Sequence, residues 1–371
     1  MFRDLIRRIK WLWFWDFKNV IPELLIEGTK QGLPFAKTIL FTDDVHSKRE
    51  QQIAEQYQGH NKYNYFKRKS KRMQEIELKC YKAFDLVVTI TNSDRKDIIN
   101  MDPSLEPKLR YVNFVFSSWD KPMFQSSGAV QSEYNSFHLK SWDERSGLVF
   151  VGNGENPTNI HAINWYLKEI AVLLIKDFPG LVLNIIGPGW DSFQSQNSGD
   201  LRLVFKGSTA TDEMGAFIDS CKVFVSPIIA STGINTKNVL ALSRGIPLVT
   251  TPAGAIGMCE SCDTSTMSSP VDIFDTSQKK QDDYPLLIGM DVYDFSEKVK
   301  RLLSDKSLWK EYSEKGISHN EIWFSKYKAA KQLDESLYSL YNSNSIDSNS
   351  NNVLSYTLLL LLSILLLLYK E

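Results

Sequence analysis

Between residues 146 and 341, short apolar runs alternate with stretches in which apolar residues recur at helical spacing. The apolar runs have the length of buried strands and cover 147–151, 181–186, 203–205, 223–225 and 246–250. Helical periods accompany them at 159–175, 216–221, 236–243, 295–303 and 317–341, the last of which could cross back to the first domain. Strands that alternate with helices form parallel sheets covered on both faces. This pattern predicts an α/β, Rossmann-like domain over 146–341.

The region before residue 123 shows the same alternation in shorter form. Strands are predicted at 38–41, 86–90 and 109–116, and helices at 48–58 and 69–84. Few residues precede the first clear strand, so the sequence predicts an incomplete Rossmann-like domain over 1–122. A linker rich in Ser and Gln follows over 123–145.

The two ends of the chain differ from this pattern. Residues 353–369 contain ten leucines and no charge, and as a helix they would be about 26 Å long, close to the hydrocarbon thickness of a bilayer. Residues 342–352 are almost wholly Asn, Ser and Asp, which is typical of a flexible tether. The pattern predicts a C-terminal transmembrane helix on a polar tether, and hence a membrane protein with a single C-terminal anchor.

The N-terminal segment 1–17 combines four basic residues with Trp11, Trp13 and Trp15. A basic, Trp-rich helix can lie on an anionic membrane surface. A helix that covers a domain edge fits the same residues, and both interpretations stay open.

Composition narrows the classes of function. Hydrophobic residues make up 43% and charged residues 23% of the chain, as in an ordinary globular protein. The 43 basic and 44 acidic residues nearly cancel, so only a local patch could attract a polyanion. The basic segment 62–72 could contact phospholipid or RNA, but a solvated helix face is the preferred interpretation. Four cysteines exclude a disulfide scaffold and fit a reducing compartment.

Gly152 and Gly154 follow a predicted strand and precede a predicted helix. Backbone N–H groups at such a turn can bind phosphate. Pro157 stands where a dinucleotide fingerprint has its third glycine, so this is not that motif. A plain strand-to-helix turn remains an alternative.

The segment 227–252 is the most informative part of the sequence. Ser231–Ile234 precedes a predicted helix whose first turn contains Thr236 and Lys237. A glycine at 233 lets the backbone approach a ligand, the helix N-terminus favours a diphosphate, and Lys237 adds a positive charge. A surface loop with a routine helix-ending glycine at 245 is the alternative.

Two further groups of residues have chemical potential. Asp43, Asp44, His46 and Arg49 cluster after a predicted strand, where a histidine can take a proton or contact a sugar hydroxyl. A structural histidine is equally compatible. The CxxC pair at 259–262 has no second pair or nearby His, which disfavours zinc, and a redox role has no further support.

In this order and spacing, the motifs resemble glycosyltransferase family 4, the group 1 glycosyltransferases. The matching segments are 43–49, 148–152, 156–165, 185–187, 205–207, 221–227, 232–237 and 245–251. The resemblance implies a GT-B fold with two Rossmann-like domains, an acceptor-side domain over 1–122 and a nucleotide-sugar domain over 146–341. It also implies sugar transfer from a nucleotide-sugar donor, usually with retention and without an essential metal or cofactor.

The resemblance implies roles for individual residues. His46 and Lys237 would be the catalytic residues, His46 from the acceptor side and Lys237 at the leaving diphosphate. The donor would be bound by Gly152, Gly154, Gly187, Pro227, Thr232, Gly233, Ile234 and Thr236. The C-terminal anchor would direct this chemistry toward a lipid-linked or membrane-proximal acceptor, with the domains in the cytosol and no nucleic-acid partner.

Two positions depart from the family pattern. Leu240 replaces the glutamate that binds ribose, and Ile256 replaces an acidic residue after the next strand. A membrane-bound glycosyltransferase is therefore the main prediction. The alternative is a catalytically inactive GT-B scaffold, or a nucleotide-binding protein tethered to a membrane.

Overall fold

The computed structural model describes residues 9–13, 37–113, 140–200, 202–207, 211–259, 262 and 284–342. The chain divides into two compact units. The first unit comprises Met1–Val115, Thr232–Ile234 and Trp323–Glu371, and the second comprises Phe116–Ser231 and Asn235–Ile322. Each unit has its own parallel sheet, as the sequence pattern predicted.

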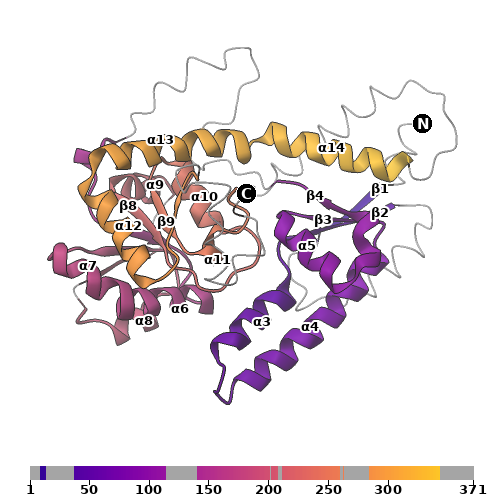
Figure 1. Cartoon of the computed structure of the whole chain (residues 1–371), viewed down its shortest axis with the longest axis horizontal. Helices are drawn as coiled ribbons and strands as arrows, with labels where there is room; N and C mark the ends of the chain where they lie inside the picture. Colours follow the sequence, from indigo (N-terminus) through magenta and orange to yellow (C-terminus); the bar gives the residue numbers. More distant parts are fainter. Residues whose placement is uncertain are drawn as a thin grey trace, which may run out of the picture. The chain divides into compact units, whose positions relative to one another are not determined.

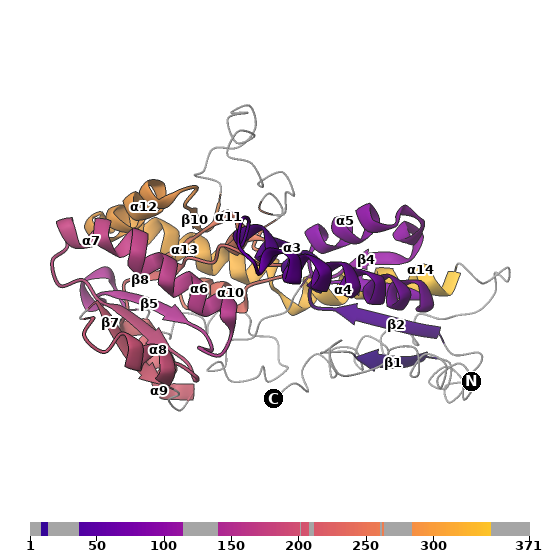
Figure 2. The ribbon, with the colours of Figure 1, turned by 90° about the horizontal axis from the view of Figure 1, so that it is seen from below.

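The sheet of the first unit has four parallel strands in the order β1-β2-β3-β4. Their bounds are β1 Ile9–Trp13, β2 Lys37–Thr42, β3 Leu86–Thr89 and β4 Leu109–Tyr111. The prediction of a helix in the N-terminal segment is wrong for Ile9–Trp13, which pairs with β2 (Figure 2). An isoleucine and two tryptophans in five residues favour a strand, because aromatic and β-branched side chains fit a pleated surface.

Both faces of the first sheet are covered by helices. Alternate residues of a strand point to opposite faces, so Leu40 and Val87 pack on one face and Ile39 and Val88 on the other. The first face is covered by α4 Tyr63–Ala83, α5 Asn92–Met101 and the 3-10 helix η1 Pro103–Lys108. The second face packs on Ala329 and Leu333 of α14, Lys326–Asn342. Figure 1 shows α4 paired with α3, His46–Gln56, as a helical hairpin.

Helix α14 belongs to the first unit although it follows the second in sequence. Asn113, just after β4, fixes the chain there with two hydrogen bonds. Its Nδ2 donates to the carbonyl of Trp323 (2.6 Å), and its backbone N–H donates to Oε1 of Gln332 (2.8 Å). The sequence pattern extended the second domain to residue 341 and allowed its last helix to cross back, and the structure groups that helix with the first sheet.

The second unit contains a six-stranded parallel sheet in the order β10-β9-β8-β5-β6-β7. Its strands are β5 Leu148–Val151, β6 Leu183–Ile186, β7 Leu203–Gly207, β8 Val223–Ser226, β9 Leu248–Thr250 and β10 Leu287–Ile288. The five predicted strands are confirmed. The strand order reverses between β5 and β8, which pair directly. Such a reversal is where doubly wound sheets bind ligands, outside the carboxyl ends of the strands.

The helices of this unit are α6 Pro157–Trp165, the π-helical turn η4 Tyr166–Ile170, α7 Ala171–Asp177, α8 Asp191–Gln196, α9 Thr211–Ser220, α10 Thr236–Ser243, α11 Pro252–Ala255, α12 Val292–Ser304 and α13 Lys306–Trp323. Side chains of α6, η4, α7, α8, α12 and α13 share one large hydrophobic core with the sheet. A further 3-10 helix, η3 Trp142–Glu144, precedes β5. The core contains β5, η4 and α12 side chains such as Phe150, Ile170 and Phe295, all with 0% exposure.

The predicted transmembrane helix is corrected by the structure. Across the ranges that the structure describes, no helix combines the length and the apolar character needed to cross a membrane. The predicted tether 343–352 and helix 353–369 themselves lie outside these ranges. A C-terminal transmembrane span as part of the fold, and a localisation through a single C-terminal anchor, are therefore not supported.

Candidate functional site

The turn after β5 lies at the point where the order of the second sheet reverses. Asn156 begins α6 as its N-cap: its side chain accepts from the backbone N–H of Thr158 at 3.0 Å, and Pro157 stands in the first turn. The N–H of Gly152 donates to Ile186 and that of Gly154 to Pro188, at 2.9 and 2.8 Å. These two N–H groups already donate within the protein, so they are not available to donate to a phosphate.

Glycine is required here because two turns touch backbone to backbone. Gly187, after β6, has a φ of 130°, and a Cβ on it would lie 2.3 Å from the carbonyl oxygen of Gly152. A Cβ on Gly154 would lie 2.4 Å from the carbonyl oxygen of Gly189. The indole Nε1 of Trp190 also donates to the carbonyl of Gly152 at 2.8 Å. The turn is therefore held rigidly against the end of β6.

The N-terminus of α10 has a different character. Its N-cap residue, Asn235, has no side-chain hydrogen bond to the helix, and its Nδ2 instead donates to Oγ of Ser231 at 3.1 Å. In the described part of the chain, the backbone N–H groups of Thr236 and Lys237 donate to no protein acceptor. Free N–H groups at a helix N-terminus carry a partial positive charge and bind anions.

Lys237 adds a titratable amine at this helix N-terminus. Its ammonium donates to Oδ1 of Asn159 and lies 4.6 Å from the ring centroid of Phe150. No carboxylate of the described residues pairs with it. Burial lowers the pKa of Lys237 to about 7. A diphosphate beside this amine would favour its protonated form and pair with the resulting positive charge. A buried amine without a carboxylate partner is therefore well suited to bind such an anion.

The predicted donor-loop residues Thr232, Gly233 and Ile234 group with the first unit. Oγ1 of Thr232 donates to Oδ2 of Asp44 at 3.1 Å. Gly233 has a φ of 68°, and a Cβ on it would lie 2.6 Å from the carbonyl oxygen of Asp43. The positive φ and this close approach both require glycine at 233.

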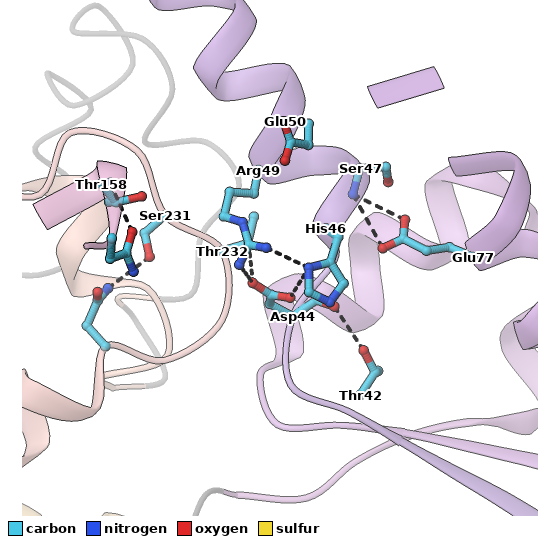
Figure 3. A network of polar contacts seen from close by, with 12 residues as sticks. Thr42, Asp44, His46, Ser47, Arg49, Glu50, Glu77, Thr158, Ser231 and Thr232 are labelled. Carbon is cyan, nitrogen blue, oxygen red and sulfur yellow. Dashed lines mark hydrogen bonds and ion pairs between the residues drawn. The ribbon is translucent and has the colours of Figure 1, made fainter. Parts of the chain in front are cut away.

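His46 begins α3 in the first unit, and its ring lies beside Arg49 and Asp44 (Figure 3). Its Nδ1 lies 2.6 Å from Nη2 of Arg49 and 3.3 Å from Oδ1 of Asp44, while Nη1 of Arg49 donates to Oδ2 of Asp44. A guanidinium has only donors, so Nδ1 accepts and neutral His46 carries its proton on Nε2. In this state His46 can donate to a sugar hydroxyl or a phosphate oxygen, but its ring cannot take a proton at Nε2.

Glu77 lies at the N-terminus of the same helix (Figure 3). Val45, the N-cap residue of α3, supplies no side-chain cap, and both carboxylate oxygens of Glu77 accept from the N–H of Ser47 at 3.3 Å. The side chain is fully buried. Burial raises the pKa of Glu77 to about 7 despite the hydrogen bonds from Ser47 and His46. Glu77 thus supplies the hydrogen-bond acceptor for the first turn of this helix from inside the protein, and burial favours its protonated form below pH 7.

The structure shows where the two residues that depart from the family pattern lie. Leu240 is buried within α10 at 5% exposure, and Ile256 follows α11. The CxxC residues Cys259 and Cys262 form a disulfide, whereas Cys80 and Cys221 are buried thiols. Among the described residues, no three His, Cys, Asp or Glu side chains are grouped to hold a metal ion.

The predicted site residues therefore fall into two sets. In the second unit, Gly152, Gly154 and Gly187 pack together, and Lys237 reaches the same turn through Asn159. Pro227 is buried directly after β8, and Thr236 is exposed at the start of α10. The first unit holds His46 and the segment Thr232–Ile234. Asn159 and Glu77 were not predicted as site residues, because only the folded chain shows what they contact.

Comparison with known proteins gives a family for the second unit. Residues 145–305 match the family described as "Glycosyl transferases group 1". Over 162 residues the chain is also 25% identical to an uncharacterized 44.6 kDa protein in the cps region of Klebsiella pneumoniae. That match covers 38% of this chain and 41% of the relative, so the two share about two fifths of their lengths.

Solved structures extend the likeness to most of the chain. Sucrose-phosphate synthase from Thermosynechococcus elongatus matches with a TM-score of 0.58 and 12% identity, over 91% of this chain and 74% of that one. Anabaena HepE, in complex with UDP and glucose, matches with a TM-score of 0.57 and 10% identity, over 91% and 80%. At these identities the likeness shows the fold, which is that of the GT-B glycosyltransferases.

The fold is therefore that of the GT-B proteins. The match over residues 145–305 confirms the resemblance to the group 1 glycosyltransferases that was stated from the motifs.

Proposed function

We propose that the chain transfers a glycosyl group from a nucleotide sugar to an acceptor, with the leaving diphosphate bound at the N-terminus of α10. The observation that carries this proposal is the ammonium of Lys237. Among the residues that the structure describes, it has no counter-charge, and the neighbouring backbone N–H groups of Thr236 and Lys237 have no acceptor. Charge builds up on the leaving diphosphate in the transition state, so fixed donors there lower the barrier.

The proposal includes the finer expectations from the sequence. Lys237 and the helix N–H groups supply positive charge without a metal, and transfer proceeds with retention as in the resembling family. The donor is bound on a nucleotide-sugar surface that includes Gly152, Gly154, Gly187, Pro227 and Thr236. HepE, whose fold is similar, is described in complex with UDP, which makes UDP-sugars the first donors to test.

His46 would act from the first unit through its Nε2–H. With Nδ1 accepting from Arg49, this group is a donor, and it would orient an acceptor hydroxyl or stabilise a phosphate oxygen. The acceptor itself is unidentified, and no nucleic-acid partner is expected from the near-neutral charge of the chain.

The test is turnover of UDP-, GDP- and ADP-sugars by the full chain, with Lys237→Ala beside it. Sugar release or transfer is expected from one donor class, and Lys237→Ala should lower kcat/KM by about 100-fold, since one lost oxyanion donor costs about 2.7–4 kcal/mol. EDTA should leave the rate unchanged, and the anomeric configuration of the product should match that of the donor.

Leu240 and Ile256 favour a second candidate, a catalytically inactive GT-B scaffold that binds a nucleotide. Buried Leu240 cannot accept hydrogen bonds from ribose hydroxyls. The same panel separates the two candidates. Binding of a nucleoside diphosphate without turnover of any donor, from folded protein, would support the scaffold.

A further inference from the structure

Asn159 connects two parts of the candidate donor site. It lies in the first turn of α6 with 5% exposure. Its Nδ2 donates to the carbonyl of Asn153 in the glycine turn at 2.9 Å, and its Oδ1 accepts from the ammonium of Lys237 on α10. One buried amide thus holds the turn after β5 and the cation after β8.

The glycine turn is built around this amide. A Cβ on Gly152 would lie 2.7 Å from Nδ2 and 2.9 Å from Cγ of Asn159, so the turn accepts the amide only because residue 152 has no side chain. The amide is therefore fixed on both sides: by the backbone of the turn and by its hydrogen bond to Asn153.

The same amide restricts the lysine. A lysine side chain loses up to about 2 kcal/mol of rotamer entropy when it is ordered. Asn159 and the ring of Phe150 order Lys237 before any ligand arrives. An ammonium has three N–H donors, and with one bonded to Asn159 the others are available to an anion.

We propose that Asn159 is a positioning residue: it pre-orients the Lys237 ammonium for the donor diphosphate and ties it to the turn after β5. This inference rests on the proposed function, because it assigns the anion that Lys237 receives. A neutral amide suits the role, since it accepts a hydrogen bond and leaves the positive charge available. A carboxylate at 159 would hold the lysine more tightly and cancel that charge.

A four-protein cycle tests the proposal in the full chain: the native protein, Asn159→Ala, Lys237→Met and the double variant. Affinity for UDP-glucose, or for whichever donor the panel selects, is measured by calorimetry. Asn159→Ala should weaken binding about tenfold in the native background and less than about twofold beside Lys237→Met, because the effect of Asn159 passes through the lysine.

Asn184→Ala is the matched control. Asn184 also donates through Nδ2 to a backbone carbonyl, that of Leu148 at 2.9 Å, in the same sheet. It has no contact with Lys237, so its loss should leave donor affinity unchanged. Thermal unfolding of every variant confirms that each is folded at the temperature of the titration.

A second measurement does not depend on any nucleotide. The pKa of Lys237 is followed by NMR of its 15N-labelled Nζ. Asn159→Ala should lower this pKa, since the ammonium loses an acceptor, whereas Asn159→Asp should raise it by pairing the charge. Asn184→Ala should not move it.

Two outcomes overturn the proposal. Equal loss of affinity from Asn159→Ala in both backgrounds would show that Asn159 acts through the turn alone. A Lys237 pKa that is the same in Asn159→Ala, Asn159→Asp and the native protein would show that the amide does not hold the ammonium. If instead the NMR shifts appear but no nucleotide sugar binds, the pairing stands and the proposed function fails.

Discussion

Two helix N-termini in this protein, those of α3 and α10, differ in the charged group that lies beside their first-turn N–H groups. Neither α3 nor α10 is capped by the side chain of its own N-cap residue, Val45 or Asn235. At α3 a buried carboxylate from α4, Glu77, accepts from the first turn. At α10 no carboxylate among the described residues accepts from the first turn, and Lys237 adds a second source of positive charge.

The difference separates a helix end that is occupied from within the protein from one that we propose to bind a ligand. A helix N-terminus attracts an anion in either case. Where a buried carboxyl group of the protein accepts from the first turn, the end is closed and can only position what lies on it, here His46. Where the protein supplies a cation, the end is available to an external anion. Changing the charge at either end tests this distinction directly.

The largest effect is expected from Glu77→Gln. The pKa of Glu77 is about 7 in the folded protein against 4.5 ordinarily, so between these values the unfolded chain releases a proton that the folded one retains. The native unfolding free energy should therefore fall as pH rises from 4.5 to 7 and stay level above 7, a change on the order of 3 kcal/mol. Glu77→Gln should lack this decrease.

Urea unfolding at pH 5 and pH 8 measures this change in the unfolding free energy. The two proteins should be similar at pH 5, and Glu77→Gln should be the more stable one at pH 8. Glu75→Gln, an exposed change on the same helix, is the control and should follow the native profile. An identical slope in the native protein and Glu77→Gln would show that Glu77 is not the buried group with the raised pKa.

An intermediate effect is expected from pH on donor binding. The pKa of Lys237 is about 7 in the free protein, so raising the pH through 7 removes the ammonium that we propose as the diphosphate ligand. Affinity for a nucleotide sugar, whose phosphates do not titrate in this range, should fall roughly tenfold between pH 6 and pH 9. Lys237→Arg should bind with little pH dependence, because a guanidinium stays charged. Equal pH profiles for the two proteins would argue against Lys237 as the diphosphate ligand.

The smallest effect is expected from closing α10 with Asn235→Asp. A carboxylate at the N-cap should raise the unfolding free energy by about 0.5–1 kcal/mol and weaken donor binding several-fold through repulsion of the diphosphate. Asn235→Ser also places a neutral capping residue at the N-cap. It should leave the unfolding free energy close to that of the native protein and should not repel the diphosphate. Denaturant unfolding and calorimetry on the same samples check both. Unchanged affinity in Asn235→Asp would mean that the anion binds elsewhere.

The sequence predicted those parts of the molecule whose cause is local. The strands β5, β6 and β8 are short apolar runs between turn residues, and α10 was predicted with the same bounds that it has. The places of Lys237 in the first turn of a helix and of Gly187 directly after a strand could be predicted, because both follow from position alone. Their roles in binding stay predictions.

What escaped prediction depends on contacts between distant residues. Asn159 is a polar residue at the start of a helix, and its meaning appears only when Lys237 folds against it. Glu77 lies in a helix with many charged residues and gives no sign in sequence that it is buried. Strand β1 was missed because its five residues depend on pairing with β2, and their basic neighbours suggested a helix.

The contact between the turns at Gly152 and Gly187 has a consequence for how this chain can diverge. A side chain at 187 would displace the carbonyl of Gly152, and with it the hydrogen bond from Trp190. A substitution at Gly152, Gly187 or Trp190 therefore alters the contacts of the other two. We expect these three residues to change together, or only after the turn that follows β5 has taken another conformation.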